Sequence, residues 1–198
     1  MMDVSGDGID PMQDRSGHES SVLSKPLALA ELEVHIRYAA LADLAEVSAL
    51  FRNVVGGLQI YNEASRQTEL VRLCEPALEA IMASDPKAIL VATLHPSKAI
   101  VGFCIAINQP AKTWIEAGKI WIEWLGTDIK MRRNNIGQSL INHLIADAPS
   151  RGATKVTCST ITKNRASMAL FKKAGFKRYR TLRNQWYGQD MHFFERIL

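Results

Sequence analysis

The spacing of apolar residues changes several times along the chain, and each change marks an expected element. Residues 33–38 alternate apolar and polar side chains, which is typical of a strand. Residues 42–54 carry apolar side chains at helical spacing, and two glycines follow, so we expect a helix that ends near Gly56. A second helical stretch covers 64–83. Pro76 should divide it, because proline is tolerated in the first turn of a helix but not inside one.

The residues that follow are rich in β-branched and aromatic side chains. Residues 88–94 and 99–107 are apolar runs joined by the turn 95–98, which is the pattern of an antiparallel hairpin. The remaining expected elements are strands over 119–127, 155–161, 178–186 and 190–197 and helices over 136–145 and 164–174.

The order of these elements, β-α-α-β-β-β-α-β-α-β-β, predicts an α/β or α+β fold with a mixed sheet and no internal repeats. Residues 1–30 combine Gly, Ser, Asp and Pro without apolar periodicity, so we expect a disordered or loosely attached arm there. The rest, 31–198, is predicted to be a single domain. At 198 residues, the chain can bury a core of its own without a disulfide or a metal.

The charges divide the chain into an acidic and a basic part. Residues 1–33 hold seven acids against two basic residues, whereas residues 130–183 hold thirteen Lys and Arg against the single acid Asp147. Such a basic segment can bind nucleic acid, an acidic membrane surface or a phosphorylated small ligand, or it can be a solvated face. We rank nucleic acid lowest, because no element combines basic and aromatic residues in one stripe.

Several classes of protein do not fit the sequence. No apolar run approaches the ~18 residues that span a bilayer, and the N-terminus lacks the apolar centre of a secretory signal. The three cysteines are far apart and form no C-x-x-C pair, so we expect a reduced, cytoplasmic compartment. The five histidines show no metal-ligand spacing, and no metal site is expected.

Residues 125–140 carry the strongest signal for a ligand. A strand leads into a short basic loop that contains Asn and Gly, and the loop opens directly onto an amphipathic helix. Backbone N–H groups and the positive helix end therefore point at whatever lies above the loop, where Arg132 and Arg133 add charge. A pyrophosphate suits this run of donors best. The alternative is an ordinary strand–loop–helix without a ligand. The sequence contains no P-loop, dinucleotide-binding fingerprint or nucleophile elbow that would indicate another kind of site.

Two motifs resemble those of the GCN5-related N-acetyltransferase (GNAT) family. Residues 132–137, Arg-Arg-Asn-Asn-Ile-Gly, resemble the family's acetyl-CoA motif R/Q-x-x-G-x-G/A, with Asn135 in place of the first glycine. Asparagine tolerates left-handed backbone better than most residues, so the loop can still form. Residues 164–176 resemble the family's N-x-x-A/S-x-x-L-Y/F-x-x-x-G-F helix. One helix and one strand separate the two motifs, as in the family.

The resemblance implies the acyl-CoA N-acyltransferase fold, with a V-shaped opening between the strands 119–127 and 155–161 that takes acetyl-CoA and needs no metal. A backbone N–H near Leu125 or Gly126 would stabilise the oxyanion formed on attack. The residues implied in holding acetyl-CoA are Leu125, Gly126, Thr127, Arg132, Arg133, Asn134, Asn135, Ile136, Gly137, Gln138, Ser139, Asn164, Ser167, Phe171 and Lys173.

Glu123 is the candidate catalytic base. It interrupts an otherwise apolar strand, and because burial of an unpaired carboxylate is costly, it should face solvent or a cleft. A carboxylate in a partly apolar site can take the proton of an arriving ammonium group, directly or through water. Relatives commonly carry this glutamate at the position of Trp121, two residues earlier. The alternative is an exposed strand residue or an acceptor-binding charge.

Phe171 stands where many relatives have a tyrosine that protonates the leaving thiolate. Phenylalanine cannot do this, although a thiol with a pKa of about 8.5 leaves as thiolate without much help. Tyr179 and Tyr187 are candidates for the missing acid, against a simple bridging role between core and surface. Trp121 and Trp186 are candidates to line the acceptor pocket, against an ordinary role in the core.

The sequence therefore predicts a cytoplasmic N-acetyltransferase that moves the acetyl group of acetyl-CoA directly to a primary amine of a small molecule, peptide or protein. The alternative, favoured by Phe171 and Asn135, is a catalytically weak acyl-CoA-binding or regulatory module. We expect neither a membrane nor a nucleic acid as partner. The sequence leaves a homodimer open and does not identify the acceptor.

Overall fold

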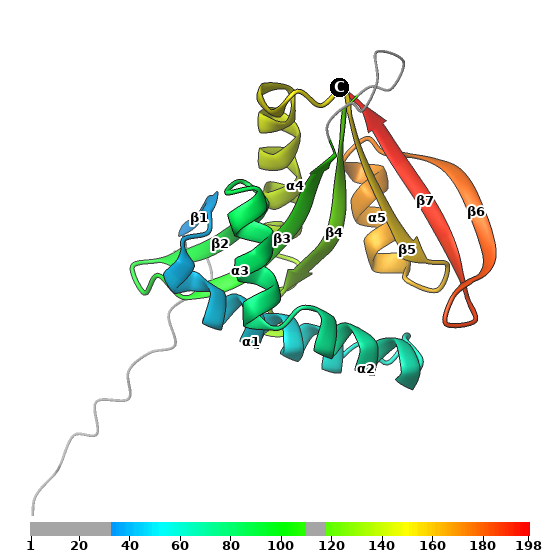
Figure 1. The fold of residues 1–198 in the computed structure, drawn as a ribbon, viewed down its shortest axis with the longest axis horizontal. Helices are drawn as coiled ribbons and strands as arrows, with labels where there is room; N and C mark the ends of the chain where they lie inside the picture. Colours follow the sequence, from blue (N-terminus) through cyan, green and yellow to red (C-terminus); the bar gives the residue numbers. More distant parts are fainter. Residues whose placement is uncertain (1–32, 110–117) are drawn as a thin grey trace, which may run out of the picture. The chain divides into compact units, whose positions relative to one another are not determined.

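Seven strands form one sheet in the order β1-β2-β3-β4-β5-β7-β6 (Figure 1). The computed structural model describes residues 33–109 and 118–198, and the predicted arm, 1–30, lies outside this part. All neighbouring strands are antiparallel except β4 and β5, which run parallel. The strands are β1 (Glu33–Tyr38), β2 (Ile89–His95), β3 (Ile100–Gln109), β4 (Lys119–Thr127), β5 (Lys155–Ile161), β6 (Lys177–Trp186) and β7 (Gln189–Ile197).

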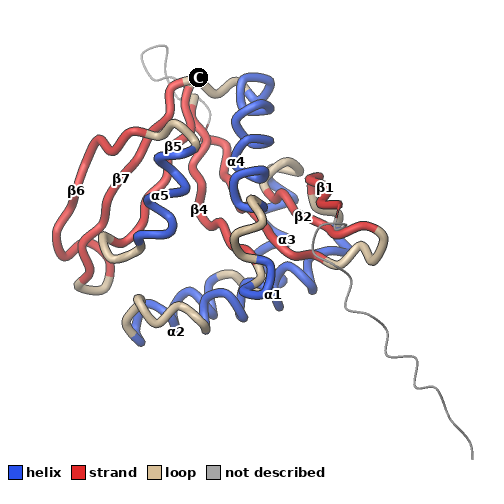
Figure 2. Tube along the Cα trace, turned by 180° about the vertical axis from the view of Figure 1, so that it is seen from behind, coloured by secondary structure: helices blue, strands red, loops and turns tan. Residues whose placement is uncertain are grey.

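Helices cover both faces of the sheet (Figure 2). One core cluster lies under α4 and α5 and includes Leu140 and Leu144, and a second lies under α1 and α3 and includes Val47 and Phe51. The α2 helix continues from α1 along the lower edge of the view (Figure 1). The helices are α1 (Leu44–Gly56), α2 (Glu63–Arg72), α3 (Glu75–Ser84), α4 (Ile136–Asp147) and α5 (Arg165–Lys173), with short 3₁₀ turns at Leu41–Asp43, Ile129–Met131 and Ala148–Arg151.

This arrangement confirms the predicted mixed α/β fold, and the elements follow the predicted order with one more helix between the first two strands, because the stretch 64–83 forms two helices. The helical stretch that was expected to divide at Pro76 does so: α2 ends at Arg72, and Pro76 lies in the first turn of α3. Within residues 33–109 and 118–198, no helix has the length and apolar character needed to cross a membrane.

β4 and β5 pair over only part of their length. Their pairing begins at Lys119 opposite Lys155 and ends at Ile122 opposite Cys158. Beyond this point the two strands separate, as the fanned arrows in the centre of Figure 1 show. The second half of β4 and the end of β5 therefore expose backbone groups toward each other across an opening.

Candidate functional site

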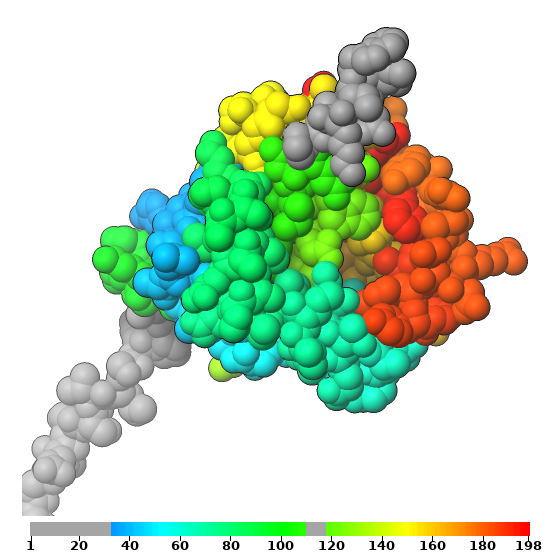
Figure 3. Space-filling model, in the orientation of Figure 1, coloured from blue at the N-terminus to red at the C-terminus, as the bar shows by residue number. Residues whose placement is uncertain are grey.

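A cavity of about 740 Å³ occupies the opening between β4 and β5. The space-filling view shows the surface hollowed between α2, β4 and the β6–β7 hairpin (Figure 3). Its walls are formed by the second half of β4, the loop before α4, the end of β5, one face of α5 and the α1–α2 region. A cavity of this size can enclose much of an extended small-molecule ligand.

The loop that leads into α4 turns its backbone toward this cavity. Arg133 and Asn135 have positive φ angles of 69° and 57°, and Asn135 adopts the left-handed conformation expected of it at the residue before α4. Its side chain makes no capping bond, so the first N–H groups of α4 have no partner from the cap. Lys173 of α5 donates to the Asn135 side-chain oxygen at 3.3 Å and brings a further positive charge to the loop.

The residues predicted to hold acetyl-CoA are brought together around this cavity, with two exceptions. Asn134 donates to the Met131 carbonyl at 3.2 Å instead, and Ser139 lies exposed on α4. Those that line the cavity are Leu125, Gly126, Thr127, Arg132, Arg133, Asn135, Ile136, Gly137, Gln138, Asn164, Ser167, Phe171 and Lys173.

Two glycines of this set let neighbouring elements approach closely. A Cβ atom on Gly126 would lie 2.6 Å from the ring of Phe103, and one on Gly137 would lie 3.2 Å from Cδ2 of Leu170. Gly126 therefore allows β4 to pack against the Phe103 ring of β3. Gly137 allows α4 to pack against α5 beside the loop that leads into α4.

A β-bulge positions Glu123 where the opening begins. In the β3–β4 ladder, Ile105 pairs with Trp124 and Ala106 pairs with Ile122, so Glu123 is the additional residue. Bulges bend a strand and redirect its side chains. The side chains of both Glu123 and Trp124 reach residues of α2.

These contacts form a chain of charges, Glu69–Arg72–Glu123. Arg72 Nη1 lies 2.6 Å from Glu123 Oε1, and Arg72 Nη2 lies 2.7 Å from Glu69 Oε2. Trp121 Nε1 donates to Glu123 Oε2 at 2.6 Å, and Trp124 Nε1 donates to Glu69 Oε2 at 2.9 Å. Burial lowers the pKa of Arg72, but hydrogen bonds and charges from both carboxylates raise it above its usual value. Two carboxylates against one guanidinium leave this end of the cavity negative, which favours a cationic guest.

The sequence did not predict Glu69 and Arg72 as residues of the site. The buried residues of α2 are Ser65 and Glu69, so this helix turns a polar face inward. A signal was present, because residues 63–72 lack the apolar stripe that a helix on a core normally shows.

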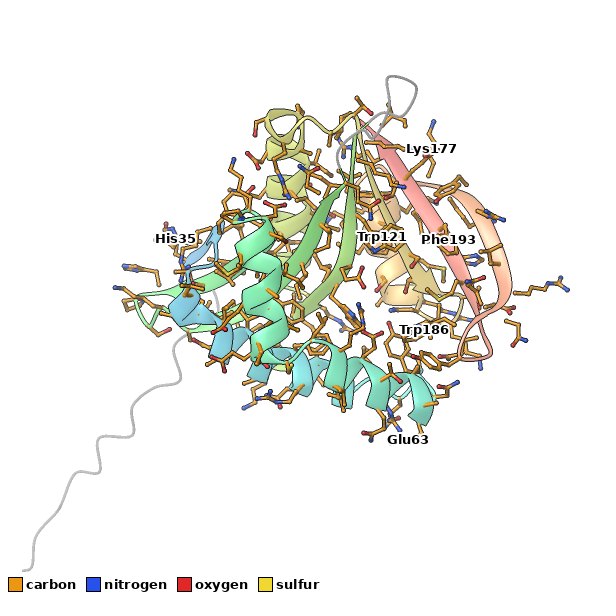
Figure 4. The ribbon with its side chains drawn as sticks, viewed as in Figure 1. His35, Glu63, Trp121, Lys177, Trp186 and Phe193 are labelled. Carbon is orange, nitrogen blue, oxygen red and sulfur yellow. The ribbon has the colours of Figure 1, made fainter. Side chains whose placement is uncertain are left out.

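Aromatic rings line the cavity beside this cluster. Tyr61, from the segment between α1 and α2, lies edge-on to Trp124 with ring centres 6.0 Å apart and to Trp186 at 5.0 Å. Figure 4 shows Trp121 at the centre of the sheet and Trp186 close to α2. Both tryptophans proposed for the acceptor pocket line the cavity.

The two tyrosines proposed as acids lie elsewhere. Tyr179 is 51% exposed and packs on Phe193, and Tyr187 is 44% exposed at the turn of the β6–β7 hairpin. Neither belongs to the residues that line the cavity.

Known proteins share this architecture. Residues 56–176 match the sequence profile of the acetyltransferase (GNAT) family. The chain belongs to the GNAT family. The resemblance read from the two motifs is thereby confirmed. No curated protein matches the chain.

Solved structures of GNAT proteins have the same fold at low sequence identity. An N-acetyltransferase from Staphylococcus aureus Mu50 is 22% identical with a TM-score of 0.67, and the match covers 83% of this chain and 98% of the other. PaiA N-acetyltransferase from Thermoplasma acidophilum, in complex with coenzyme A, is 18% identical with a TM-score of 0.65 over 84% and 99%. Naa50 from Arabidopsis thaliana, in complex with the bisubstrate analogue CoA-Ac-MVNAL, is 18% identical with a TM-score of 0.62 over 83% and 99%.

Proposed function

We propose that the chain transfers the acetyl group of acetyl-CoA directly to a primary amine. One observation carries the proposal: a single cavity joins the cationic, amide-lined loop before α4 to the negative Glu69–Arg72–Glu123 cluster. The first end suits the phosphates of acetyl-CoA, and the second suits an arriving ammonium group. Membership of the GNAT family supports acetyl transfer as the reaction class.

The residues around the cavity fit acetyl-CoA from one end to the other. Arg132, Arg133 and the free N–H groups at the start of α4 would hold the pyrophosphate. The half of β4 that does not pair with β5, from Leu125 to Thr127, would bind the pantetheine arm through its backbone. Acetyl-CoA supplies the activated acyl group, and a backbone N–H of β4 near Leu125 or Gly126 would stabilise the developing oxyanion.

Glu123 is the proposed base. Each of its oxygens already accepts one hydrogen bond, Oε1 from Arg72 and Oε2 from Trp121. A carboxylate oxygen has two lone pairs, so each oxygen can still accept a proton or a hydrogen bond from an ammonium group or a water molecule. The two donors hold the carboxylate in one orientation, which a base needs when it acts on a bound substrate.

The acceptor in this proposal is a small amine or the amine of a peptide or protein, and the compartment is the cytoplasm. The negative cluster supports a cationic acceptor, and the rings of Trp121 and Trp186 offer it a cation–π surface.

A thiol-release assay tests the proposal. The full-length protein is mixed with acetyl-CoA and, in turn, polyamines, amino acids, aminoglycosides and peptides with free N-termini. We expect release of free CoA that depends on one class of acceptor and yields the acetylated amine by mass spectrometry. Acetyl-CoA binding by calorimetry without release for any acceptor would instead support the acyl-CoA-binding module that Phe171 favours.

A further inference from the structure

The residue of α5 that stands at the position of the family's tyrosine offers the departing thiolate no hydrogen-bond donor. Phe171, at the position of the tyrosine that protonates the thiolate in many relatives, lies in the cavity wall. Its ring is 4% exposed and packs on the rings of Phe176 and Phe194, with centres 5.7 and 5.6 Å away. A hydrogen-bond donor for the thiolate would have to come from another position.

One tyrosine of the described residues lines the cavity, and it comes from the segment between α1 and α2. All four tyrosines of the chain lie in the part that the structure describes, and of these Tyr61 alone lines the cavity. Its side chain is 9% exposed. The side chain of Asn164, the residue before α5, lies close enough to the Tyr61 hydroxyl to affect its pKa. The hydroxyl is therefore near the start of the helix that carries Phe171.

The bonds of Asn164 leave the Tyr61 proton available to a guest in the cavity. The side-chain oxygen of Asn164 accepts from the Ser167 N–H at 3.1 Å, and its NH₂ group remains available to donate to the Tyr61 oxygen. A bond in this direction leaves the Tyr61 O–H free to donate into the cavity. Burial raises the pKa of Tyr61 to about 12, although the hydrogen bond from Asn164 lowers it. The hydroxyl is consequently protonated at neutral pH.

The segment around Tyr61 is held in place by the β6–β7 turn. Asn62 Nδ2 donates to the Tyr187 carbonyl at 2.6 Å, and Gln189 Nε2 donates to the Ile60 carbonyl at 3.1 Å. These bonds fix the backbone on both sides of Tyr61, and the rings described above hold its side chain. A catalytic group needs this kind of support to act within a narrow range of positions.

We propose that Tyr61 is the catalytic residue that donates a hydrogen bond to the departing thiolate, an inference that rests on the proposed acetyl transfer. The amine nitrogen attacks the thioester carbonyl carbon and forms the C–N bond. The C–S bond then breaks, the sulfur keeps the electron pair as a thiolate, and the Tyr61 O–H donates a hydrogen bond to that sulfur. The nitrogen loses one proton to Glu123 or to water, and the thiolate takes one proton from solvent. The products are an amide and a free thiol.

The Tyr61→Phe variant removes the hydroxyl and keeps the ring, so the aromatic packing survives. We would measure the pKa of the CoA thiol while CoA is bound, from the ultraviolet absorbance of the thiolate. A hydroxyl that donates to the sulfur stabilises the thiolate, so the thiol pKa should be higher in Tyr61→Phe than in the wild type by about one unit or more. Tyr38→Phe is the matched control, since the Tyr38 hydroxyl bonds to Asp147, outside the residues lining the cavity.

Turnover provides the second measurement. Tyr61→Phe should lower kcat about 10-fold or more with an unchanged KM for acetyl-CoA. An equal thiol pKa in the wild type and Tyr61→Phe would overturn the assignment. So would a greater loss of kcat in Tyr179→Phe or Tyr187→Phe, because it would place the hydrogen-bond donor on the hairpin. Failure of the proposed function would be seen separately, as the absence of acceptor-dependent thiol release in the wild type. In that case the thiol pKa of bound CoA still tests whether Tyr61 donates to the sulfur.

Discussion

Replacement of Glu123 by glutamine tests the proposed base with little change in shape. The amide oxygen can still accept one of the two bonds that Glu123 now accepts, from Arg72 Nη1 and Trp121 Nε1, each at 2.6 Å. Arg72 keeps its second partner, Glu69. The Arg72 and Glu123 side chains are 42% and 24% exposed, and a solvent-screened pair of this kind contributes only about 0–1 kcal/mol. The variant should therefore fold with nearly the stability of the wild type.

The loss should appear in the chemical step. An acceptor amine is protonated at neutral pH and must lose a proton to attack, and general base catalysis typically contributes about 10²- to 10⁴-fold to the rate. We expect Glu123→Gln to lower kcat about 10²-fold or more. Acetyl-CoA affinity should not change, because Glu123 lies at the β4 bulge and not in the loop before α4.

Thiol release measured over a range of pH separates the base from a merely structural charge. The acidic limb of the wild-type profile should move or vanish in Glu123→Gln, and high pH should rescue the variant partly by supplying free amine. Glu79→Gln, at an exposed position of α3, is the matched control. Wild-type turnover with an unaltered pH profile would remove Glu123 from catalysis and leave it an acceptor-binding or solvated charge.

Three further changes test other parts of the structure. Gly137→Val should weaken acetyl-CoA binding, measured by calorimetry, about 10-fold or more. A Cβ at this position would already lie 3.2 Å from Leu170, so two further methyl groups must displace α5. Gly56→Ala is the control and should leave binding unchanged, because no atom lies within 4 Å of the added Cβ. Deletion of residues 1–30 should leave melting temperature and activity nearly unchanged, and a fall of many degrees would show that the arm packs on the domain or on a partner. Burial would raise the pKa of Asp147, but the hydrogen bonds that it accepts lower it from 3.8 to about 2. Its contribution to stability is thus present above pH 3.8 and lost as the pH falls toward 2, and thermal melts of Asp147→Asn should lack that dependence.

The geometry of the loop that is proposed to bind acetyl-CoA was predictable because its signals are local. A strand, a basic loop and a helix start follow one another within residues 125–140, and the backbone conformation of Asn135 follows from its own side chain. Periodicity and a proline likewise sufficed for the element order and for the division between α2 and α3.

The acceptor end depends on contacts between segments far apart in the chain. Glu123 was found as an acid in an apolar strand, but the bulge that redirects it is a property of the β3–β4 register. Its partner Arg72 comes from α2, and Tyr61 from the segment before that helix. No local pattern pairs a strand residue with a helix residue fifty positions earlier, so these partners required the folded structure.

The basic segment 130–183 shows how one composition can serve two physical roles. Part of its charge, Arg132, Arg133 and Lys173, lines the cavity, where it suits phosphates. Another part lies on β6, which forms an outer edge of the sheet (Figure 1) and keeps its cations exposed over residues 177–183. A long edge strand has unpaired backbone groups that can pair with a strand of another chain. Lysine and arginine side chains on such a strand oppose this pairing because they repel the same charges on a second copy. The charge of β6 therefore needs no nucleic acid to explain it, whereas the charge beside α4 lies at the cavity that is proposed to take acetyl-CoA.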